Sequence, residues 1–436
     1  MGNYEVIMDR TKEYRKDRFG LFVHFGLFSV AGRSEWCKSI ERISEDYYQH
    51  YYDCFSAENY DPREWAKLAK RAGMKYAVLT TKHHEGFCLF DSKYTDYKAT
   101  NTKAGRDLIK EYVEAFRAEG LKVGLYYSLI DWHHPDYPHF DDLNHPRRGE
   151  AEYSDEGRDF SRYIEYMHNQ VRELCTNYGK IDIMWFDFSY GDMRGEKWEA
   201  TKLVKMVREL QPGIIIDNRL DRGREAFENL DEAPIYCGDF TSPEQFVPAK
   251  GIVDKMGRPV PWEMCQTTQV GSWGYMNGNE NFMTARQAIY TLVDCVSKNG
   301  NLLLNVGVTA KGEFPKQTVA LLEEIGEWMH QNGESIYGCG SVDLPQPAWG
   351  RLTTNGENIY AHFFDVAGQY VAVRGLESDK VDFAVHLEDC TEVELGAAGG
   401  PAALKEHLDG DLLIALKKAK LKNPIDTVVK LMLKKK

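Results

Sequence analysis

Apolar runs that end on a polar side chain recur along most of this chain. The most pronounced is Ile181–Phe186, where four consecutive large apolar residues directly precede Asp187. A run without polar alternation is typical of a strand that is buried on both faces. The centre of such a strand excludes charge, so Asp187 is expected at its end, where a cleft can open. In α/β folds that end of a parallel strand is where reactive groups are placed.

The first part of the chain alternates such strands with amphipathic helices. Strands are predicted at Phe19–Phe25, Tyr76–Thr81, Lys122–Ser128, Ile181–Phe186, Ile214–Ile216, Ile235–Phe240, Trp262–Thr268 and Asn301–Val308. Helices are predicted at Asp61–Ala72, Asp107–Ala118, Asp159–Asn177, Lys197–Leu210, Thr284–Ser297 and Phe314–Gln331. Helices of this length supply the crossover that parallel pairing requires. Residues 1–338 are therefore expected to form a (β/α)8-like barrel.

The pattern changes after Gly338 to short, roughly alternating segments separated by turn residues. These segments are Ile359–Phe364, Tyr370–Arg374, Val381–Leu387 and Thr391–Leu395. They predict a small antiparallel β-sandwich domain over residues 339–436. The Lys-rich segment from Leu412 is compatible with final strands or with a helix, and the sequence does not decide between them.

The predicted barrel places polar and aromatic groups at one rim, because the carboxyl ends of its parallel strands share that rim. The candidates are His24, Glu35, Trp36, His83, His84, Tyr126, Trp132, Asp187, Arg219, Glu244, Glu263 and Trp273. Tyr126 is preferred to Tyr127 because Val123 and Leu125 should face the helices, which turns Tyr126 inward.

Two carboxylates on different strands fit glycoside hydrolysis, in which one acts as the nucleophile and the other holds a proton for the leaving oxygen. Asp187 is the better nucleophile candidate because a strand holds it. Aromatic residues make up 12% of the chain, and aromatic faces stack on the C–H groups of sugars. Two simpler interpretations stay open, in which the aromatics fill a large core and Asp187 caps the following segment.

A metal-dependent hydrolase is an alternative interpretation of His83 and His84. Adjacent strand residues point to opposite faces, so both can reach one cation only if the strand has already ended. A His-x-His spacing would suit zinc better. A catalytically inactive carbohydrate-binding protein on the same barrel is a further alternative, although both candidate carboxylates are present.

Composition narrows the partners and the compartment. A net charge of −13 argues against nucleic acid or an anionic membrane as a partner. The nine cysteines form no CxxC pair, which suggests reduced thiols. No signal-peptide pattern is visible at the N-terminus and no apolar stretch is long enough to span a bilayer. A cytoplasmic protein is expected, and a homo-oligomer is left open.

Six longer motifs occur in order between Arg18 and Val308: FGLFVHFGLFSVAGRSEW, KHHEGFCLFDSKYTDY, GLYYSLIDW, IDIMWFDF, GDFTSPEQ and WEMCQTTQVGSWGY. Together they resemble the motifs of glycoside hydrolase family 29, the retaining α-L-fucosidases. The resemblance implies a catalytic barrel followed by a β-sandwich. It also implies an exo-acting enzyme that removes terminal α-L-fucosyl groups from oligosaccharides or glycoconjugates, with no metal and no cofactor.

The resemblance assigns roles to the candidates at the rim. Asp187 matches the nucleophile, and His24 matches a residue that hydrogen-bonds a fucose hydroxyl. The sugar pocket is matched by Glu35, Trp36, His83, His84 and Tyr126, the cleft arginine by Arg219, and a wall near the sugar's methyl group by Trp273.

The acid/base has two candidates, Glu244 and Glu263. Glu244 is favoured because a loop glutamate can approach the glycosidic oxygen, whereas Glu263 lies in an apolar strand and should brace Arg219 or a histidine. The chain departs from the family pattern at one position, where Phe188 follows Asp187 and a glycine is common. This departure concerns the leaving-group side of the site and its linkage preference.

Overall fold

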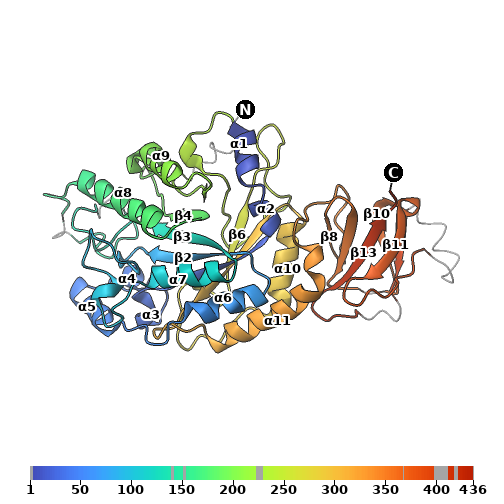
Figure 1. Ribbon diagram of the computed structural model, residues 1–436, viewed down its shortest axis with the longest axis horizontal. Helices are drawn as coiled ribbons and strands as arrows, with labels where there is room; N and C mark the ends of the chain where they lie inside the picture. The colour runs from blue at the N-terminus through green and yellow to red at the C-terminus, as the bar shows by residue number, and fades with distance from the viewer. Residues whose placement is uncertain are drawn as a thin grey trace.

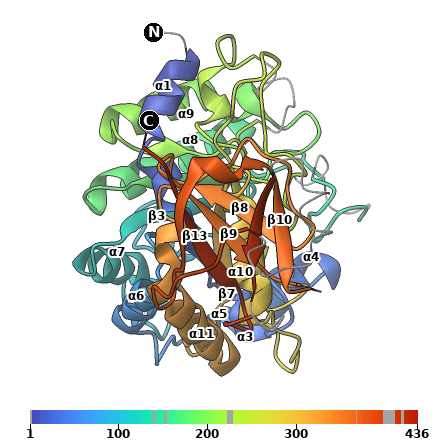
Figure 2. The same cartoon turned by 90° about the vertical axis from the view of Figure 1, so that its right-hand side faces the viewer.

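The computed structural model describes residues 3–138, 142–150, 154–221, 229–366, 368–396, 411–416 and 421–435. Figure 1 shows a large α/β unit with a smaller all-β unit beside it, at the end of the chain. The view in Figure 2 looks onto the all-β unit, with the helices and strands of the larger unit behind it. The predicted architecture, a barrel-like unit followed by antiparallel sheets, is confirmed.

One parallel sheet forms the wall of the larger unit. Its strands are β1 (Phe19–His24), β2 (Tyr76–Lys82), β3 (Lys122–Ser128), β4 (Ile183–Asp187), β5 (Ile215–Ile216), β6 (Glu263–Thr267) and β7 (Asn301–Gly307). Their order in the described residues is β5-β4-β3-β2-β1-β7-β6. Ser128 pairs with Asp187, so two polar residues end β3 and β4 at the same level, and His24 ends β1 opposite Gly307 of β7.

Alternation along each strand separates two layers of the core. Phe22, Val78, Tyr126 and Trp185 pack in the barrel interior. Residues at the alternate positions of the strands, such as Leu125, pack against the helices. Because both faces of the strands are buried, these strands read as apolar runs. The prediction that Tyr126 points inward is confirmed.

Helices cover the outside of the sheet. The long ones are α6 (Pro62–Arg71), α7 (Leu108–Ala118), α8 (Phe160–Asn177), α9 (Ala200–Leu210), α10 (Ala285–Val296) and α11 (Lys316–Asn332). Each lies within a predicted helix or within two residues of it. Side chains cap several N-termini: Asp61, Asp107 and Asp159 accept from backbone N–H groups, and Thr284 forms a capping box with Gln287.

Short helices that the sequence analysis did not anticipate occupy the N-terminal region and the loops. They are α1 (Asn3–Arg10), α2 (Tyr14–Asp17), α3 (Phe28–Ala31), α4 (Cys37–Ile40), α5 (Glu45–Cys54) and the 3₁₀ turns η1 (Ala99–Asn101), η2 (Gly195–Trp198), η4 (Ile235–Cys237), η5 (Gly333–Ser335) and η6 (Ser378–Lys380). In the described part of the chain, none of the helices is long and apolar enough to cross a membrane.

The predicted strand Ile235–Phe240 is wrong. Pro234 and Gly238, whose φ is +79°, flank a 3₁₀ turn there, and 44% of Ile235 is exposed. Single bridges begin only at Phe240, which pairs with Asp217, and end at Glu244, which pairs with Cys265. Residues 240–244 therefore span the gap between β5 and β6 without forming a regular strand, and they carry Glu244 to the rim.

The all-β unit contains two antiparallel sheets around one apolar core. Its strands are β8 (Gly350–Thr354), β9 (Asn358–Phe363), β10 (Tyr370–Glu377), β11 (Val381–His386), β12 (Asp411–Ala415) and β13 (Thr427–Leu433). The Lys-rich end of the chain thus contributes strands. The predicted strand Thr391–Leu395 is wrong, because that segment makes only isolated bridges at Glu392 and Leu395. The domain boundary after Gly338, which lies between η5 and β8, stays a prediction.

Candidate active site

A small cavity opens at the carboxyl ends of the parallel strands. Its volume is about 140 Å³, which suits one sugar ring better than an oligosaccharide, since drug-sized ligands occupy roughly 300–1,000 Å³. It is lined by Phe22, His24, Trp36, His83, His84, Tyr126, Trp185, Asp187, Phe188, Arg219, Glu244, Cys265 and Trp273. Nine of the predicted site residues are among them.

Asp187 is the last residue of β4, and both of its carboxylate oxygens are held. The Tyr126 hydroxyl donates to Oδ2 at 2.8 Å, and Arg219 Nη1 donates to Oδ1 at 2.9 Å. Only 12% of the side chain is exposed. The tyrosine and the guanidinium stabilise the negative charge of a carboxylate that faces the cavity. Asp187 is thus held in a fixed orientation at the cavity, as a nucleophile requires.

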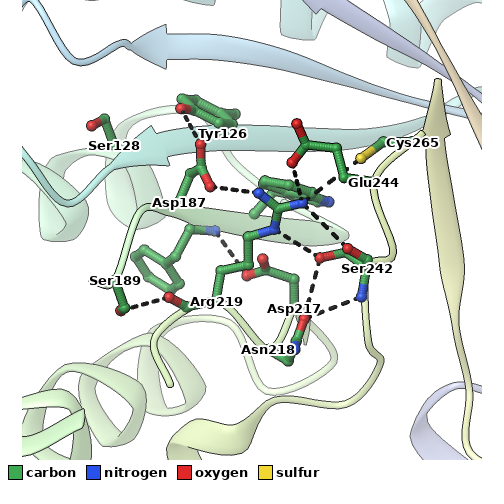
Figure 3. A network of polar contacts seen from close by, with 12 residues as sticks. Tyr126, Ser128, Asp187, Ser189, Asp217, Asn218, Arg219, Ser242, Glu244 and Cys265 are labelled. Carbon is green, nitrogen blue, oxygen red and sulfur yellow. Dashed lines mark hydrogen bonds and ion pairs between the residues drawn. The ribbon is translucent and has the colours of Figure 1, made fainter. Parts of the chain in front are cut away.

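Arg219 joins the two predicted catalytic carboxylates. Its Nη1 binds Asp187, its Nη2 donates to Glu244 Oε2 at 2.9 Å, and its Nε donates to Ser242 Oγ at 2.9 Å (Figure 3). The guanidinium also lies 4.5 Å from the ring centre of Trp185. Burial works to lower the pKa of Arg219, but the neighbouring carboxylates outweigh it and raise the pKa above its usual value. Arg219 therefore remains a cation between two acids.

Glu244 differs from Asp187 in its access to solvent. Its side chain is 38% exposed, and it sits on the segment that bridges β5 and β6. A group in this position can exchange a proton with water and with a leaving group that passes through the mouth of the cavity. Asp187, on its rigid strand, cannot do so as readily. The two carboxylates are therefore suited to different roles.

Asp217 is a third carboxyl group that the sequence analysis missed. It follows β5, is fully buried, and accepts from the backbone N–H of Phe186 at 2.9 Å. Burial raises the pKa of Asp217 well above its usual value, against the opposing effect of Arg219. Asp217 lies below Arg219 and supports the end of β4 through its bond to the Phe186 N–H (Figure 3).

Two histidines present a hydrogen-bond acceptor to the cavity. Asn305 donates to the Trp273 carbonyl, so its amide oxygen faces His24 Nδ1 at 2.6 Å. Ser128 likewise donates to Ile130 and accepts from His84 Nδ1 at 2.7 Å. Both Nδ1 atoms must carry the hydrogen. Burial lowers the pKa of both imidazoles well below the usual value, so the neutral Nε2 atoms can accept from sugar hydroxyls.

His83 lies between these two imidazoles. Its ring stacks on Tyr126 with centres 5.6 Å apart, and its Nδ1 is 3.5 Å from Glu85 Oε2. Both residues are almost fully buried. Packing against Tyr126, and against Phe28 with ring centres 5.2 Å apart, holds the His83 ring at the cavity.

Glu35 and Glu263 do not reach the cavity surface. Glu35 Oε2 accepts from Ser272 Oγ at 2.9 Å and from the backbone N–H groups of Trp273 and Gly274 at 3.0 and 2.7 Å. It therefore fixes the loop that carries Trp273. Trp132 lies behind Trp36, with its indole N–H bound to Asp142 at 2.9 Å.

Glu263 braces the barrel interior. It accepts from the Tyr76 hydroxyl and from Trp185 Nε1 at 3.4 Å. The expectation that it would contact Arg219 or a histidine is wrong, because its position on β6 lies below them. Burial raises the pKa of Glu263 to about 7. Such a value suits a general acid, but the position does not.

The sequence contained a signal for some of the missed residues. Trp185 lies two positions before Asp187 on the same strand, and Phe22 two positions before His24, so both share the face of a predicted residue. Cys265 lies two positions after Glu263 on β6 and so shares the face of that predicted residue. Across the described ranges, there is no group of three or more His, Cys, Asp and Glu side chains that could hold a metal ion.

Comparison with known proteins supports this picture. A sequence model of the family described as "Alpha-L-fucosidase" matches residues 5–334. The chain belongs to the α-L-fucosidase family. The resemblance of its motifs to this family is therefore confirmed.

Solved and curated fucosidases extend the match beyond the motifs. α-L-Fucosidase isoenzyme 1 from Paenibacillus thiaminolyticus is 52% identical, with a TM-score of 0.93 over 98% of this chain and 100% of that one. A Bacteroides thetaiotaomicron α-L-fucosidase trapped as a covalent intermediate with 2-fluoro-fucosyl fluoride is 28% identical, with a TM-score of 0.85 over 98% and 96%. Human plasma α-L-fucosidase is 30% identical over 73% of this chain and 68% of its own.

Proposed function

We propose that the cavity binds the terminal fucosyl group of an oligosaccharide or glycoconjugate, with Asp187 as nucleophile and Glu244 as acid/base. The enzyme is a retaining α-L-fucosidase, consistent with the covalent intermediate trapped in a solved relative. The observation that carries the proposal is Asp187 itself. It is a carboxyl group held by Tyr126 and Arg219 at the base of a cavity of one-sugar size.

The reaction has two displacements. In the first, a protonated Glu244 gives its proton to the glycosidic oxygen while the C1–O bond breaks and an Asp187 oxygen bonds to C1. In the second, Glu244 takes a proton from water, the water oxygen bonds to C1, and the Asp187–C1 bond breaks. Two inversions at C1 give net retention. The positive charge of Arg219 favours the anion of Asp187 when it leaves.

The remaining cavity residues suit fucose recognition. The neutral His24 and His84 offer acceptor nitrogens for sugar hydroxyls. Trp273, whose ring centre lies 5.5 Å from that of His24, supplies an apolar surface for the C5 methyl group. A site of this kind penalises epimers steeply, because a misplaced hydroxyl leaves buried polar groups unpaired.

The Asp187→Ala variant tests the proposal. We expect turnover of an aryl α-L-fucoside to fall by at least about a thousandfold, because the step that forms the intermediate is lost. Added azide should restore part of the rate and yield the fucosyl azide of inverted configuration, which proton NMR identifies. Asp182→Asn, at the opposite end of β4, is the matched control and should retain turnover. Near-normal activity of Asp187→Ala would overturn the assignment.

A further inference from the structure

The three residues that follow β5 each reach a different part of the active site. Asp217 supports the end of β4, and Arg219 binds both catalytic carboxyl groups. Asn218 stands between these two residues in the sequence, and its side chain points to the segment that carries Glu244 (Figure 3). The reaction described above gives Asn218 no role, although it occupies a position between two residues that shape the site.

Asn218 presents its amide oxygen to Ser242. Its Oδ1 accepts from the Ser242 N–H at 3.1 Å and from the Ser242 hydroxyl at 3.2 Å. A backbone N–H can only donate, so the amide atom that faces it is the oxygen and not the NH2 group. Arg219 Nε donates to the same serine hydroxyl at 2.9 Å. The single hydroxyl hydrogen therefore goes to Asn218, which leaves a lone pair of the serine oxygen for Arg219.

This contact holds the acid/base segment on the side where no regular strand supports it. Residues 240–244 pair with β6 through the backbone, whereas on the β5 side one bridge holds Phe240 at the start of the segment. Further along, the Ser242 N–H donates to the Asn218 side chain, and Pro243 has no N–H to donate. Asn218 thus supplies the hydrogen bond that a regular strand would receive from its neighbour's backbone.

We propose that Asn218 is a positioning residue for acid catalysis, which acts on Glu244 through Ser242. The inference rests on the proposed function, in which Glu244 is the acid/base. Arg219 Nη2 donates to Glu244 Oε2 at 2.9 Å and to the Ser242 carbonyl at 3.2 Å, so a shift of Ser242 displaces the guanidinium and the acid together. Asp187 depends less on Asn218, because β4 and a tyrosine hydroxyl also hold it.

The test compares two aryl α-L-fucosides whose leaving groups differ in their need for a proton. Phenyl α-L-fucoside needs the acid, whereas 2,4-dinitrophenyl α-L-fucoside releases a phenolate of low pKa and hardly does. We expect Asn218→Ala to lower the ratio of kcat/KM for the phenyl over the dinitrophenyl fucoside by about tenfold, a part of what a positioned acid contributes. Loss of folded protein lowers both values equally and leaves the ratio unchanged. Asn218→Asp keeps an acceptor oxygen at the same place and should retain most of the ratio.

The matched control is Asn355→Ala in the all-β unit. Asn355 Oδ1 also accepts from two N–H groups, those of Glu357 and Asn358 at 3.0 and 2.9 Å, and its loss should leave the ratio unchanged. A wild-type ratio in Asn218→Ala, or an equal fall in Asn218→Ala and Asn218→Asp, would overturn the inference. Glu244→Gln, measured alongside, should lower the ratio further. An unchanged ratio in Glu244→Gln would show instead that the proposed acid/base is wrong.

Discussion

At the scale of single residues, the site depends on one arginine serving two acids. Arg219 donates to Asp187 and to Glu244 from different nitrogens, and Ser242 and Trp185 hold the guanidinium in place. The acids differ in exposure, 12% for the Asp187 side chain and 38% for the Glu244 side chain. A double displacement needs a nucleophile and an acid/base, and the difference in exposure supports the proposal of Asp187 for the first role and Glu244 for the second.

The choice between Glu244 and Glu263 as acid/base can be tested with leaving groups. A phenolate of low pKa needs little protonation, so loss of the acid should slow natural oligosaccharides far more than activated substrates. We expect Glu244→Gln to retain much of its first-step rate on dinitrophenyl α-L-fucoside while losing about a hundredfold or more on unactivated fucosides. Pre-steady-state kinetics would measure both. If Glu263→Gln shows this dependence and Glu244→Gln does not, the acid is Glu263.

Glu263 should instead affect the pH dependence of stability. Its folded-state pKa is about 7, against 4.5 for an exposed glutamate. The folded protein therefore holds a proton that the unfolded chain loses, so stability falls as pH rises from about 4.5 to about 7 and then levels off. Replacing it with the non-titrating Gln removes that loss. Relative to wild type, Glu263→Gln should gain on the order of 3 kcal/mol between pH 4.5 and 8.

Urea denaturation at several pH values measures this difference. A stability difference between Glu263→Gln and wild type that stays constant over this range would show that Glu263 does not titrate there. Glu173→Gln serves as a control. Glu173 is also a buried glutamate, but it lies on α8, away from Glu263 in the sequence, and accepts from Ser92 Oγ at 2.8 Å.

Residues at strand ends could be predicted because successive side chains along a strand point to opposite faces, which fixes the ones that face inward. His24, Tyr126 and Asp187 follow from that rule. The positions of Glu35 and Glu263 could not be predicted. Glu35 is drawn to the N–H groups of a loop more than 200 residues away in the sequence, and Glu263 lies one layer deeper on β6 than a cavity residue. Both depend on tertiary contacts that no local pattern encodes.

At the scale of elements, the segment that carries Glu244 is the least regular part of the barrel. Residues 240–244 join β5 and β6 through the bridges Asp217–Phe240, Thr241–Trp262 and Glu244–Cys265. Its apolar pattern at Ile235–Phe240 resembled a strand, but Pro234 and Gly238 prevent one. Long apolar strands and capped helices could be predicted from local pattern. A segment defined by single bridges and a turn could not.

Gly238 makes this arrangement possible. A Cβ at position 238 would lie 2.1 Å from the Asp217 carbonyl oxygen, and φ is +79°. We expect Gly238→Ala to destabilise the protein by about 2 kcal/mol or more and to lower kcat/KM, because Arg219 follows Asp217 closely. Gly213→Ala, with nothing within 4 Å of the added Cβ, should change stability by less than about 0.5 kcal/mol. Equal effects of the two variants on thermal unfolding would contradict this explanation.

At the scale of the whole molecule, the barrel and the antiparallel sheets are joined by polar contacts. Arg351 on β8 binds Asp294 on α10 at 2.5 Å, and the indole N–H of Trp328 on α11 donates to the Asp426 carbonyl at 3.1 Å. His362 and Asp426 are fully buried and bind each other at 2.7 Å. The change of pattern after Gly338 predicted two kinds of architecture, but these long-range partners could not be read from sequence.

The site lies at the carboxyl ends of the barrel strands, and we propose that Asp187 there forms the covalent fucosyl-enzyme. Treatment with 2-deoxy-2-fluoro-α-L-fucosyl fluoride slows the second step more than the first and should accumulate this intermediate. Intact-mass measurement followed by peptide mapping then locates the label. We expect one label per chain, on Asp187. A label on any other residue, or turnover of fucosides with no label at all, would contradict it.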